Sequence, residues 1–379
     1  MIKLVFVYIT RFMLRLLSIL PIKKEQWMFI SYHGKSYSCN PKYVYRYAMK
    51  NMNIKIKPIW VLNSAEAAKA EELKGARVVR HKSIQFFYYL MTSKVVISNN
   101  GVGSFYPKRK NQIVVNTWHG GGAYKRVGIE TGKTEKKIAL LISKQTDIFV
   151  SSSKMFTDVM TGSAMVPKTR FLSVGMPRND IFFHDYSDIA IKVRQYYGIS
   201  SDTKIILYAP TYRGDMHKEY FKNQMDIINI QKTIEERFGG TWVFAIRMHY
   251  FLSAQLNVDN AIDMSEYQDM QELLCAADVF ITDYSSTIWD YSFLRKPGFL
   301  FVPDLKEYEK ERTFYTEPRT WPFELATSNS DMVDIIKNFD QGEMLQKINK
   351  HHQIFGNYEN GDASKNILKT ISRRYRGGN

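Results

Sequence analysis

The chain of 379 residues is longer than a single hydrophobic core usually organises, which predicts two domains of ordinary size. Its 45% hydrophobic and 24% charged residues exclude a disordered chain, and its two distant cysteines, Cys39 and Cys275, indicate neither a disulfide framework nor a zinc site. The 53 Lys and Arg against 37 Asp and Glu give a net charge of +16, which favours polyanions, anionic membrane surfaces or phosphorylated substrates as partners.

The first segment, MIKLVFVYITRFMLRLLSIL, is strongly apolar but contains three cations. On a helix, Lys3, Arg11 and Arg15 fall within about a third of the circumference. Two arginines near the middle of a membrane span would cost about 2.5–3.5 kcal/mol each, and no small-residue cleavage site follows. We therefore expect an amphipathic helix over residues 1–22 that lies in a membrane interface. The alternative is a terminal helix packed on the protein's own surface.

Strands and helices alternate along the rest of the chain, which is the pattern of parallel βαβ units. Strands are expected at 27–32, 56–62, 94–100, 112–118, 147–153 and 169–175, and a second series at 204–211, 241–249, 278–285 and 297–303. Helices are expected between them, for example at 42–51, 83–93 and 135–144. The pattern predicts two Rossmann-like domains, 23–185 and 186–379. A helical stretch at 341–375 can cross back from the second domain to the first.

Ligands of open α/β sheets bind beyond the carboxyl ends of the strands, so motifs that directly follow strands are the candidate sites. Four such motifs carry reactive or phosphate-binding side chains: WHGGG (118–122), YAPTYRGD (208–215), RMHY (247–250) and TDYSST (282–287). None of them matches the GxGxxG or Walker fingerprint.

The TDYSST motif is typical of a phosphate site at the start of a helix. Asp283 ends a strand, and Ser285 and Ser286 open a helix whose free N–H groups and dipole favour an anion. The alternative is an ordinary N-cap, because Ser and Asp are preferred capping residues.

The other motifs supply cations and imidazoles. Thr211 and Arg213 follow a strand, and an arginine can hold a phosphate with two parallel hydrogen bonds. Arg247 and His249 share one face of a strand end, where a neighbouring cation favours a neutral imidazole, although a lone histidine there is more often structural. His119 directly follows a strand, and it is the better catalytic candidate. The three glycines after it (Gly120, Gly121, Gly122) let a ligand approach the backbone closely.

Six stretches, in order, resemble the CDP-glycerol glycerophosphotransferase family, whose enzymes prime or extend teichoic acids and related glycerol- or ribitol-phosphate polymers. They are SYHGKSYSCNPKYVYRYAM (31–49), TWHGGGAYKRVG (117–128), GMPRNDIFF (175–183), ILYAPTYRGD (206–215), RMH (247–249) and ITDYSSTIWDYSFLRKPGFLFVPDLKEYEKERTFY (281–315). The resemblance implies a GT-B fold, with two Rossmann-like domains and an active-site cleft between them. It also implies peripheral attachment to the cytoplasmic face of the cell membrane.

Residue by residue, the resemblance implies that His119 is the catalytic base and His249 the second active-site histidine. The donor-binding residues it implies, together with neighbours in the same motifs, are Thr211, Arg213, Arg247, Asp283, Ser285 and Ser286. The sequence departs from the family's usual WHGTP motif at Gly121 and Gly122, as capsule-type relatives do, and Cys39 replaces the usual acid of its SYSDNP motif.

The implied reaction transfers glycerol phosphate, or a related alditol phosphate, from CDP-glycerol or CDP-ribitol to a hydroxyl of a lipid-linked or polymeric acceptor, and releases CMP. His119 would take the hydroxyl proton, and the cations and helix start would hold the diphosphate. We expect Gly120, Gly121, Gly122 and Lys125 to form an acceptor loop; for Lys125 and Arg126 the alternative is a solvated helix start.

Two other classes of protein share some of these features. A nucleotide-sugar glycosyltransferase or epimerase would have the same two-domain fold, and a nucleic-acid-binding protein the same charge, although no nucleic-acid-binding motif is present. No tightly bound metal is expected, because the motifs lack a His/Asp/Glu cluster with ligand spacing. The oligomeric state, a homo-oligomer included, and the choice between glycerol and ribitol donors are left open.

Overall fold

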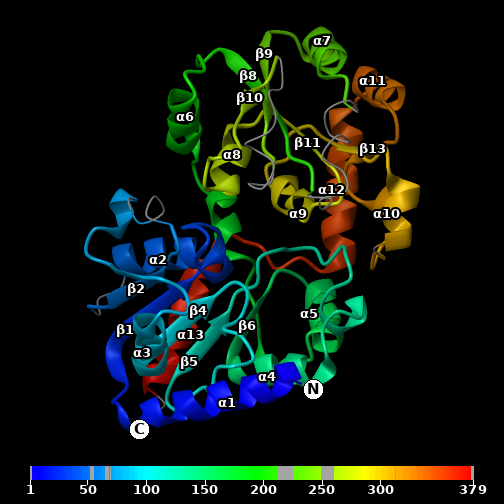
Figure 1. Ribbon diagram of the computed structural model, residues 1–379. Helices are drawn as coiled ribbons and strands as arrows, with labels where there is room; N and C mark the ends of the chain where they lie inside the picture. The colour runs from blue at the N-terminus through cyan, green and yellow to red at the C-terminus, as the bar shows by residue number, and fades with distance from the viewer. Residues whose placement is uncertain are drawn as a thin grey trace. The chain divides into compact units, whose positions relative to one another are not determined.

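The computed structural model describes residues 2–51, 55–64, 68, 70–211, 225–248, 260–311 and 313–376, whose helices and strands are drawn in Figure 1. The chain forms two compact units. The N-terminal unit consists of Met1–His119, Val127–Asp180 and Asn357–Asn379, and the C-terminal unit of Gly120–Arg126 and Ile181–Gly356. The division between the units lies at 180/181, where 185/186 was expected, and a short segment after His119 belongs to the C-terminal unit. The last segment of the chain belongs to the N-terminal unit, toward which a terminal helix was expected to cross back.

The N-terminal unit is built on a parallel sheet with the strand order β3-β2-β1-β4-β5-β6-β7. Its strands are β1 (Lys23–Ile30), β2 (Lys57–Val61), β3 (Arg77–Val79), β4 (Ser93–Ser98), β5 (Ile113–Asn116), β6 (Ile148–Ser151) and β7 (Phe171–Ser173). Its helices are α1 (Ile2–Leu16), α2 (Cys39–Asn51), α3 (Ile84–Thr92), α4 (Lys136–Gln145), α5 (Lys154–Ser163) and α13 (Ala363–Arg376). The central strands are buried on both faces, which is why they are continuous runs of Val and Ile.

The C-terminal unit contains a second parallel sheet, with the order β10-β9-β8-β11-β12-β13. Its strands are β8 (Thr203–Tyr208), β9 (Thr241–Ile246), β10 (Ile262–Asp263), β11 (Val279–Thr282), β12 (Gly298–Phe301) and β13 (Glu324–Ala326). Its helices are α6 (Ser187–Tyr196), α7 (Ile227–Phe238), α8 (Met270–Ala276), α9 (Thr287–Ser292), α10 (Leu305–Glu311), α11 (Asn329–Lys337) and α12 (Gln341–Phe355). The α/β fold with two parallel sheets is thus confirmed, and every expected strand is present with shifted ends.

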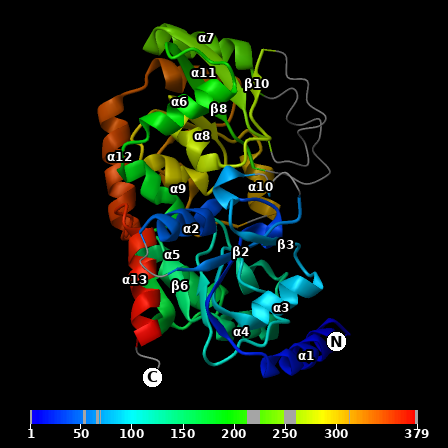
Figure 2. The ribbon, with the colours of Figure 1, turned by 90° about the vertical axis from the view of Figure 1, so that its left-hand side faces the viewer.

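The expected helix at 341–375 is two helices. Helix α12 ends at Phe355, and Gly356, which has a φ of 63° in the left-handed region, caps it. Helix α13 then begins in the N-terminal unit, where the carboxylate of Asp180 accepts hydrogen bonds from the backbone N–H groups of Ala363 (2.9 Å) and Ser364 (2.8 Å). At its other end, the Tyr375 hydroxyl accepts a hydrogen bond from Trp27 Nε1 (2.8 Å). Both views show α13 running alongside the N-terminal sheet (Figures 1 and 2).

Helix α1 packs on the N-terminal unit with one face and presents apolar side chains on the other. Val7 and Leu14 are buried, and Arg11 Nη1 donates hydrogen bonds to the carbonyl oxygens of Ser104 (2.8 Å) and Tyr106 (2.7 Å). Arg11, one of the three cations on the expected polar arc, therefore anchors the helix to the protein. The exposed apolar side chains of this segment are Val5, Phe6, Tyr8, Ile9, Phe12, Met13, Leu16 and Ile19. Among the described residues, no helix is long and apolar enough to cross a membrane.

Candidate active site

His119 follows β5 at the carboxyl end of the N-terminal sheet, and its ring orientation is fixed by one hydrogen bond. Its Nδ1 lies 2.9 Å from the carbonyl oxygen of Asn99, which follows the neighbouring strand β4. A carbonyl oxygen can only accept, so Nδ1 carries the proton and donates it. The lone pair of the neutral ring is therefore on Nε2. The rings of Trp118 (4.7 Å between centroids) and Tyr32 (5.7 Å) pack against the imidazole.

Arg178 is hydrogen-bonded to the backbone of this histidine, and it was not among the predicted site residues. Its guanidinium is buried, and its Nη1 donates to the carbonyl oxygen of His119 (2.7 Å) and contacts the Cys39 sulfur (3.6 Å). Its backbone N–H donates to Asn40 Oδ1 (3.0 Å), and Asn40 Nδ2 in turn donates to the carbonyl oxygen of Trp118 (2.8 Å). The arginine belongs to GMPRND, a motif noted only for its resemblance, so the family pattern was the available signal for it.

The pKa of His119 is low for a physical reason. Burial lowers the pKa to about 4; the hydrogen bond to Asn99 opposes this shift, and the charge of Arg178 adds to it. The imidazole is therefore neutral at pH 7, with Nε2 able to accept a proton.

The glycines after His119 lie in the C-terminal unit and pack against the start of α9. A Cβ on Gly120 would lie 2.9 Å from Ser286 Oγ, and one on Gly121 would lie 2.1 Å from Cδ1 of the fully buried Trp289. Gly122, with a φ of 76°, lies close to the ring of Tyr124. The first two glycines thus let the backbone approach the TDYSST helix, a role that the sequence analysis did not anticipate.

Thr211 and Asp283 form a pair at the carboxyl ends of the neighbouring strands β8 and β11. Asp283 Oδ2 accepts the backbone N–H of Thr211 (2.8 Å), and Oδ1 accepts the Thr211 hydroxyl. Thr282 Oγ1 also donates to the carbonyl oxygen of Ala209 (2.7 Å). Asp283 is buried, so its carboxylate holds the YAPT turn in place.

Ser285 and Ser286 precede α9 as expected. Ser286 occupies the N-cap position without a capping hydrogen bond from its side chain, and Ser285 Oγ accepts the Thr287 hydroxyl (2.8 Å). Both serines are partly exposed. That the hydroxyls of Ser285 and Ser286 contact a phosphate stays a prediction.

Arg247 follows β9 and reaches toward the segment before α8. Its Nη2 donates to the carbonyl oxygen of Tyr267 (3.2 Å), and its Nη1 lies 3.3 Å from Met270 Sδ. The two other members of this expected group, Arg213 and His249, lie outside the described residues.

Lys125 forms part of an extended pairing and not a helix start. Its backbone bridges Phe314 in an antiparallel arrangement, and its Nζ donates to the Tyr308 hydroxyl (3.4 Å), 5.9 Å from the centre of that ring. The Tyr308 ring stacks on buried Tyr284, 4.0 Å away. Lys125 therefore lies at an aromatic cluster of the C-terminal unit, the unit to which the preceding glycines also belong.

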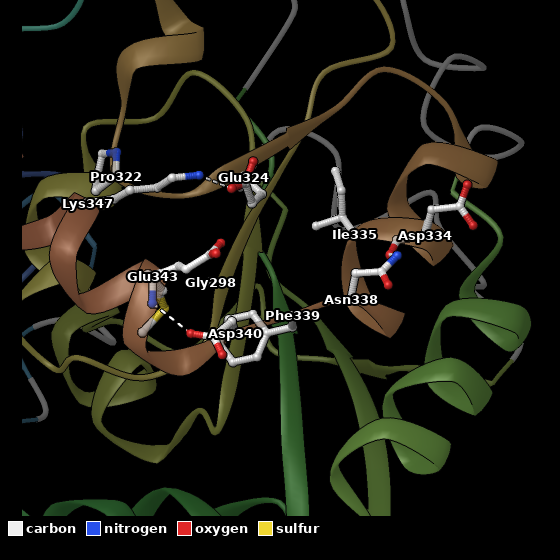
Figure 3. Close-up of a pocket in the computed structure, with 11 residues that line it drawn as sticks. Gly298, Pro322, Glu324, Asp334, Ile335, Asn338, Phe339, Asp340, Glu343 and Lys347 are labelled. Carbon is white, nitrogen blue, oxygen red and sulfur yellow. Dashed lines mark hydrogen bonds and ion pairs between the residues drawn. The ribbon is translucent and has the colours of Figure 1, made fainter.

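A cavity of about 320 Å³ in the C-terminal unit is lined by residues outside these motifs. Figure 3 shows its lining side chains. Gly298 and Glu324, which line it, begin β12 and β13, so the cavity is at the amino ends of the strands. Lys347 pairs with Glu324, and Asp340 accepts the backbone N–H of Glu343. The carboxylates of Glu324 and Asp340 are thus engaged in local structure, and no cluster of three or more potential metal ligands occurs in the described part of the chain.

The fold belongs to the class with two Rossmann-like sheets. The UDP-GlcNAc 2-epimerase of Neisseria meningitidis is similar in fold alone, with a TM-score of 0.52 and 14% identity over 92% of this chain and all of that one. The structure of the wall teichoic acid polymerase TagF is much more similar, with a TM-score of 0.84 and 26% identity over 100% of this chain and 96% of that one.

The sequence comparisons identify the family. The family model for CDP-Glycerol:Poly(glycerophosphate) glycerophosphotransferase matches residues 12–373, so the chain belongs to this family of transferases. The teichoic acid poly(glycerol phosphate) polymerase of Bacillus spizizenii is 28% identical over 94% of both chains. The polymerase of the same name from Staphylococcus epidermidis is 30% identical over 93% of this chain and 51% of its own length. The teichoic acid glycerol-phosphate transferase of Staphylococcus aureus is 27% identical over 94% of this chain and 95% of its own.

Proposed function

We propose that the protein transfers glycerol phosphate from CDP-glycerol to a hydroxyl of a membrane-associated, teichoic-acid-like or capsular polymer acceptor and releases CMP. The observation that carries this proposal is the neutral imidazole of His119, whose Nδ1 donates to Asn99 and whose Nε2 can take a proton. Family membership and the structure of a TagF histidine variant soaked with CDPG support the donor.

In the proposed reaction, the acceptor oxygen attacks the phosphorus that bears the glycerol. The bond from that phosphorus to the oxygen of the CMP phosphate breaks, CMP leaves, and the hydroxyl proton passes to His119 Nε2. Negative charge on the phosphate oxygens is stabilised by donors that already face them. We assign this role to the hydroxyls of Ser285 and Ser286 and to Arg247, with Arg213 and His249 proposed from the sequence. Thr211 is proposed to line the donor site, because its own N–H and hydroxyl both donate to Asp283. Asp283 acts through Thr211, whose N–H and hydroxyl it holds.

The acceptor loop is proposed to be Gly120, Gly121, Gly122 and Lys125, with the positive charge of Lys125 attracting an anionic acceptor. No tightly bound metal and no nucleic acid take part in the proposed mechanism. Side chains that meet phosphate oxygens supply the charge stabilisation.

Donor specificity tests this proposal against a nucleotide-sugar glycosyltransferase. The purified protein is incubated with a membrane acceptor and CDP-glycerol, CDP-ribitol or a UDP-sugar, and release of the nucleotide is followed. We expect CMP release from a CDP-alditol that depends on the acceptor. Release of UDP from UDP-sugars, with CDP-alditols inert, would establish the alternative function.

We also propose that α1 attaches the protein peripherally to the cytoplasmic face of the cell membrane. The exposed apolar side chains of α1 and the turn after it, together with the net charge of +16, support contact with an anionic lipid surface. Phe6 is 70% exposed, Phe12 63% and Ile19 91%. Deleting residues 1–20 would also remove buried Leu14 from the core, so point substitutions make the cleaner test.

Replacing Phe6, Phe12 and Ile19 together by serine is expected to weaken sedimentation with anionic liposomes by at least about tenfold, because each side chain loses its burial in lipid. The midpoint of thermal unfolding should not fall, since all three side chains are exposed. A matched triple variant replaces equally exposed isoleucines elsewhere, Ile84, Ile228 and Ile354, by serine and should bind liposomes as the unmodified protein does. Equal liposome binding by the two triple variants would contradict the anchoring role.

A further inference from the structure

A basic cluster lies at the carboxyl edge of the N-terminal sheet, on the side of β1 away from His119. His33 follows β1, and His81 follows the edge strand β3. Their rings lie 5.5 Å apart between centroids, at an angle of 32°. Lys35 and Lys82 are two residues and one residue further along the chain from these histidines, and both lysine residues are exposed. We call these four residues the edge cluster.

The imidazoles of the edge cluster have unused hydrogen-bonding capacity. Neither ring makes a hydrogen bond to any described residue, although the backbone of both histidines is bonded: Asn63 Nδ2 donates to the carbonyl oxygen of His33 (3.0 Å), and Asn63 Oδ1 accepts the N–H of His81 (3.1 Å). Asn63 follows β2, so it ties together the turns after three adjacent strands. The two rings are thus held side by side by their backbones, and their nitrogens are not committed to that task.

The charges around the rings are positive. Burial is the main cause that lowers the pKa of His33, and the charges of Lys35 and Lys82 lower it further. Burial also lowers the pKa of His81, to about 4, and the charges of His33 and Lys82 add to this shift. A bound anion would offset the repulsion between these positive charges, because two ammonium groups and two ring N–H groups could donate to it.

The cluster continues the candidate active site along the sheet edge. In the strand order β3-β2-β1-β4-β5, His119 follows β5 and His81 follows β3, four strand spacings or roughly 19 Å away. Tyr32 bridges the interval, since its ring contacts that of His119 and it directly precedes His33. An extended chain that ended at His119 would therefore pass the edge cluster.

We infer that His33, His81, Lys35 and Lys82 form a subsite for a phosphodiester of the acceptor chain, behind the hydroxyl that reacts at His119. This inference rests on the proposed function. A phosphodiester carries one negative charge with oxygens that accept from ring N–H and ammonium donors. Two lysines disfavour a metal ion between the histidines, because cations repel it.

The test measures acceptor binding by calorimetry without a donor and so without chemistry. The full-length protein is titrated with synthetic oligo(glycerol phosphate) of two and of eight units, with CDP-glycerol, and with anionic liposomes. Variants are the double substitution His33→Ala with His81→Ala, the single substitution Lys82→Ala, and the control Lys110→Ala. Lys110 is also exposed, but it precedes β5 and so lies on the side of the sheet where the strands begin, away from the edge cluster.

The unmodified protein should bind the eight-unit chain more tightly than the two-unit chain. The double histidine variant should bind the eight-unit chain about tenfold or more weakly, and should no longer prefer it to the two-unit chain. Lys82→Ala should lose part of the affinity for the eight-unit chain, and Lys110→Ala should keep all of it. Affinity for CDP-glycerol and for liposomes should stay unchanged in all variants. Retained preference for the longer chain in the double variant, or an equal loss of CDP-glycerol or liposome binding, would overturn the inference. A bound metal ion that the double variant loses would overturn it as well.

The two proposals fail differently. If the unmodified protein releases CMP only with an acceptor, and the double histidine variant binds the longer chain as tightly as the unmodified protein does, the subsite is wrong and the transferase function stands. Failure of the unmodified protein to bind either CDP-glycerol or the oligomers removes both.

Discussion

Replacement of His119 by alanine is expected to lower the single-turnover rate by about two to four powers of ten, while the affinity for CDP-glycerol hardly changes. The imidazole is the group whose Nε2 can take the acceptor proton. Its Nδ1 donates to the carbonyl oxygen of Asn99, and Arg178 donates to the backbone carbonyl oxygen of the same histidine. His119→Gln sharpens the test: its amide can still donate to the Asn99 carbonyl, but it is not a base. Both variants should therefore be similarly slow in single-turnover measurements.

The second histidine provides the comparison. If His249 only donates a hydrogen bond to the diphosphate, His249→Gln should recover part of the rate that His249→Ala loses. Near-normal turnover by His119→Gln, or loss of donor binding in His119→Ala with His249→Ala unaffected, would show that the assigned roles are wrong.

The same base sets an expected pH dependence. Because burial lowers the pKa of His119 to about 4, the imidazole of the free protein is neutral above that pH and loses its lone pair below it. For the unmodified protein, kcat/KM should thus be independent of His119 ionisation from neutral pH down to about pH 5 and fall through about pH 4. A pH profile of kcat/KM that lacks this limb in His119→Gln, at its lower rate, would agree with the assignment.

Gly121→Ala is expected to destabilise the C-terminal unit by about 1–3 kcal/mol and to impair turnover. The added Cβ would lie 2.1 Å from Cδ1 of Trp289, far inside contact distance. Trp289 has no room to move, because it is fully buried and packs against Phe293 and Phe355. The loop would have to withdraw from the start of α9, and with it Ser286. Denaturant unfolding and the KM for CDP-glycerol should both report the change.

Gly162→Ala is the matched control for this substitution. Gly162 lies within α5, and its added Cβ would find its nearest neighbour, Glu130 Oε1, 3.8 Å away. Alanine there should be neutral or slightly stabilising, since glycine is the poorer helix former. Stability and turnover of Gly121→Ala equal to those of this control would contradict the packing role of the loop.

Much of the fold could be predicted from the sequence, because buried parallel strands leave a strong signal. Apolar runs such as KVVIS and DVFIT are typical of central parallel strands, and they form β4 and β11. The edge strands β3, β10 and β13 were not predicted, because runs of two or three residues show little periodicity; β7 is equally short, and it was predicted only as part of the longer run 169–175. The direction of the Arg11 side chain was also inaccessible, because it depends on carbonyl groups of residues 104 and 106.

The candidate site was predictable as a set of motifs but not as a set of contacts. The position of His119 after a strand follows from hydrophobic patterning, whereas its bond to Asn99 depends on β4 lying beside β5. The Thr211–Asp283 pair likewise exists because β8 and β11 are neighbours, an order that the sequence does not state. Arg178 and the two histidines of the edge cluster come from segments far apart in the chain, so only the folded structure brings them to one sheet edge.

The most direct test of the proposed function follows both products of one reaction. With CDP-glycerol labelled in the glycerol and a membrane acceptor, the CMP released and the label incorporated into acceptor are measured over the same time course. The account predicts one glycerol phosphate incorporated for each CMP released by the unmodified protein, and neither product above background with His119→Ala. CMP release without incorporation into acceptor, or incorporation that persists at the normal rate in His119→Ala, would contradict it.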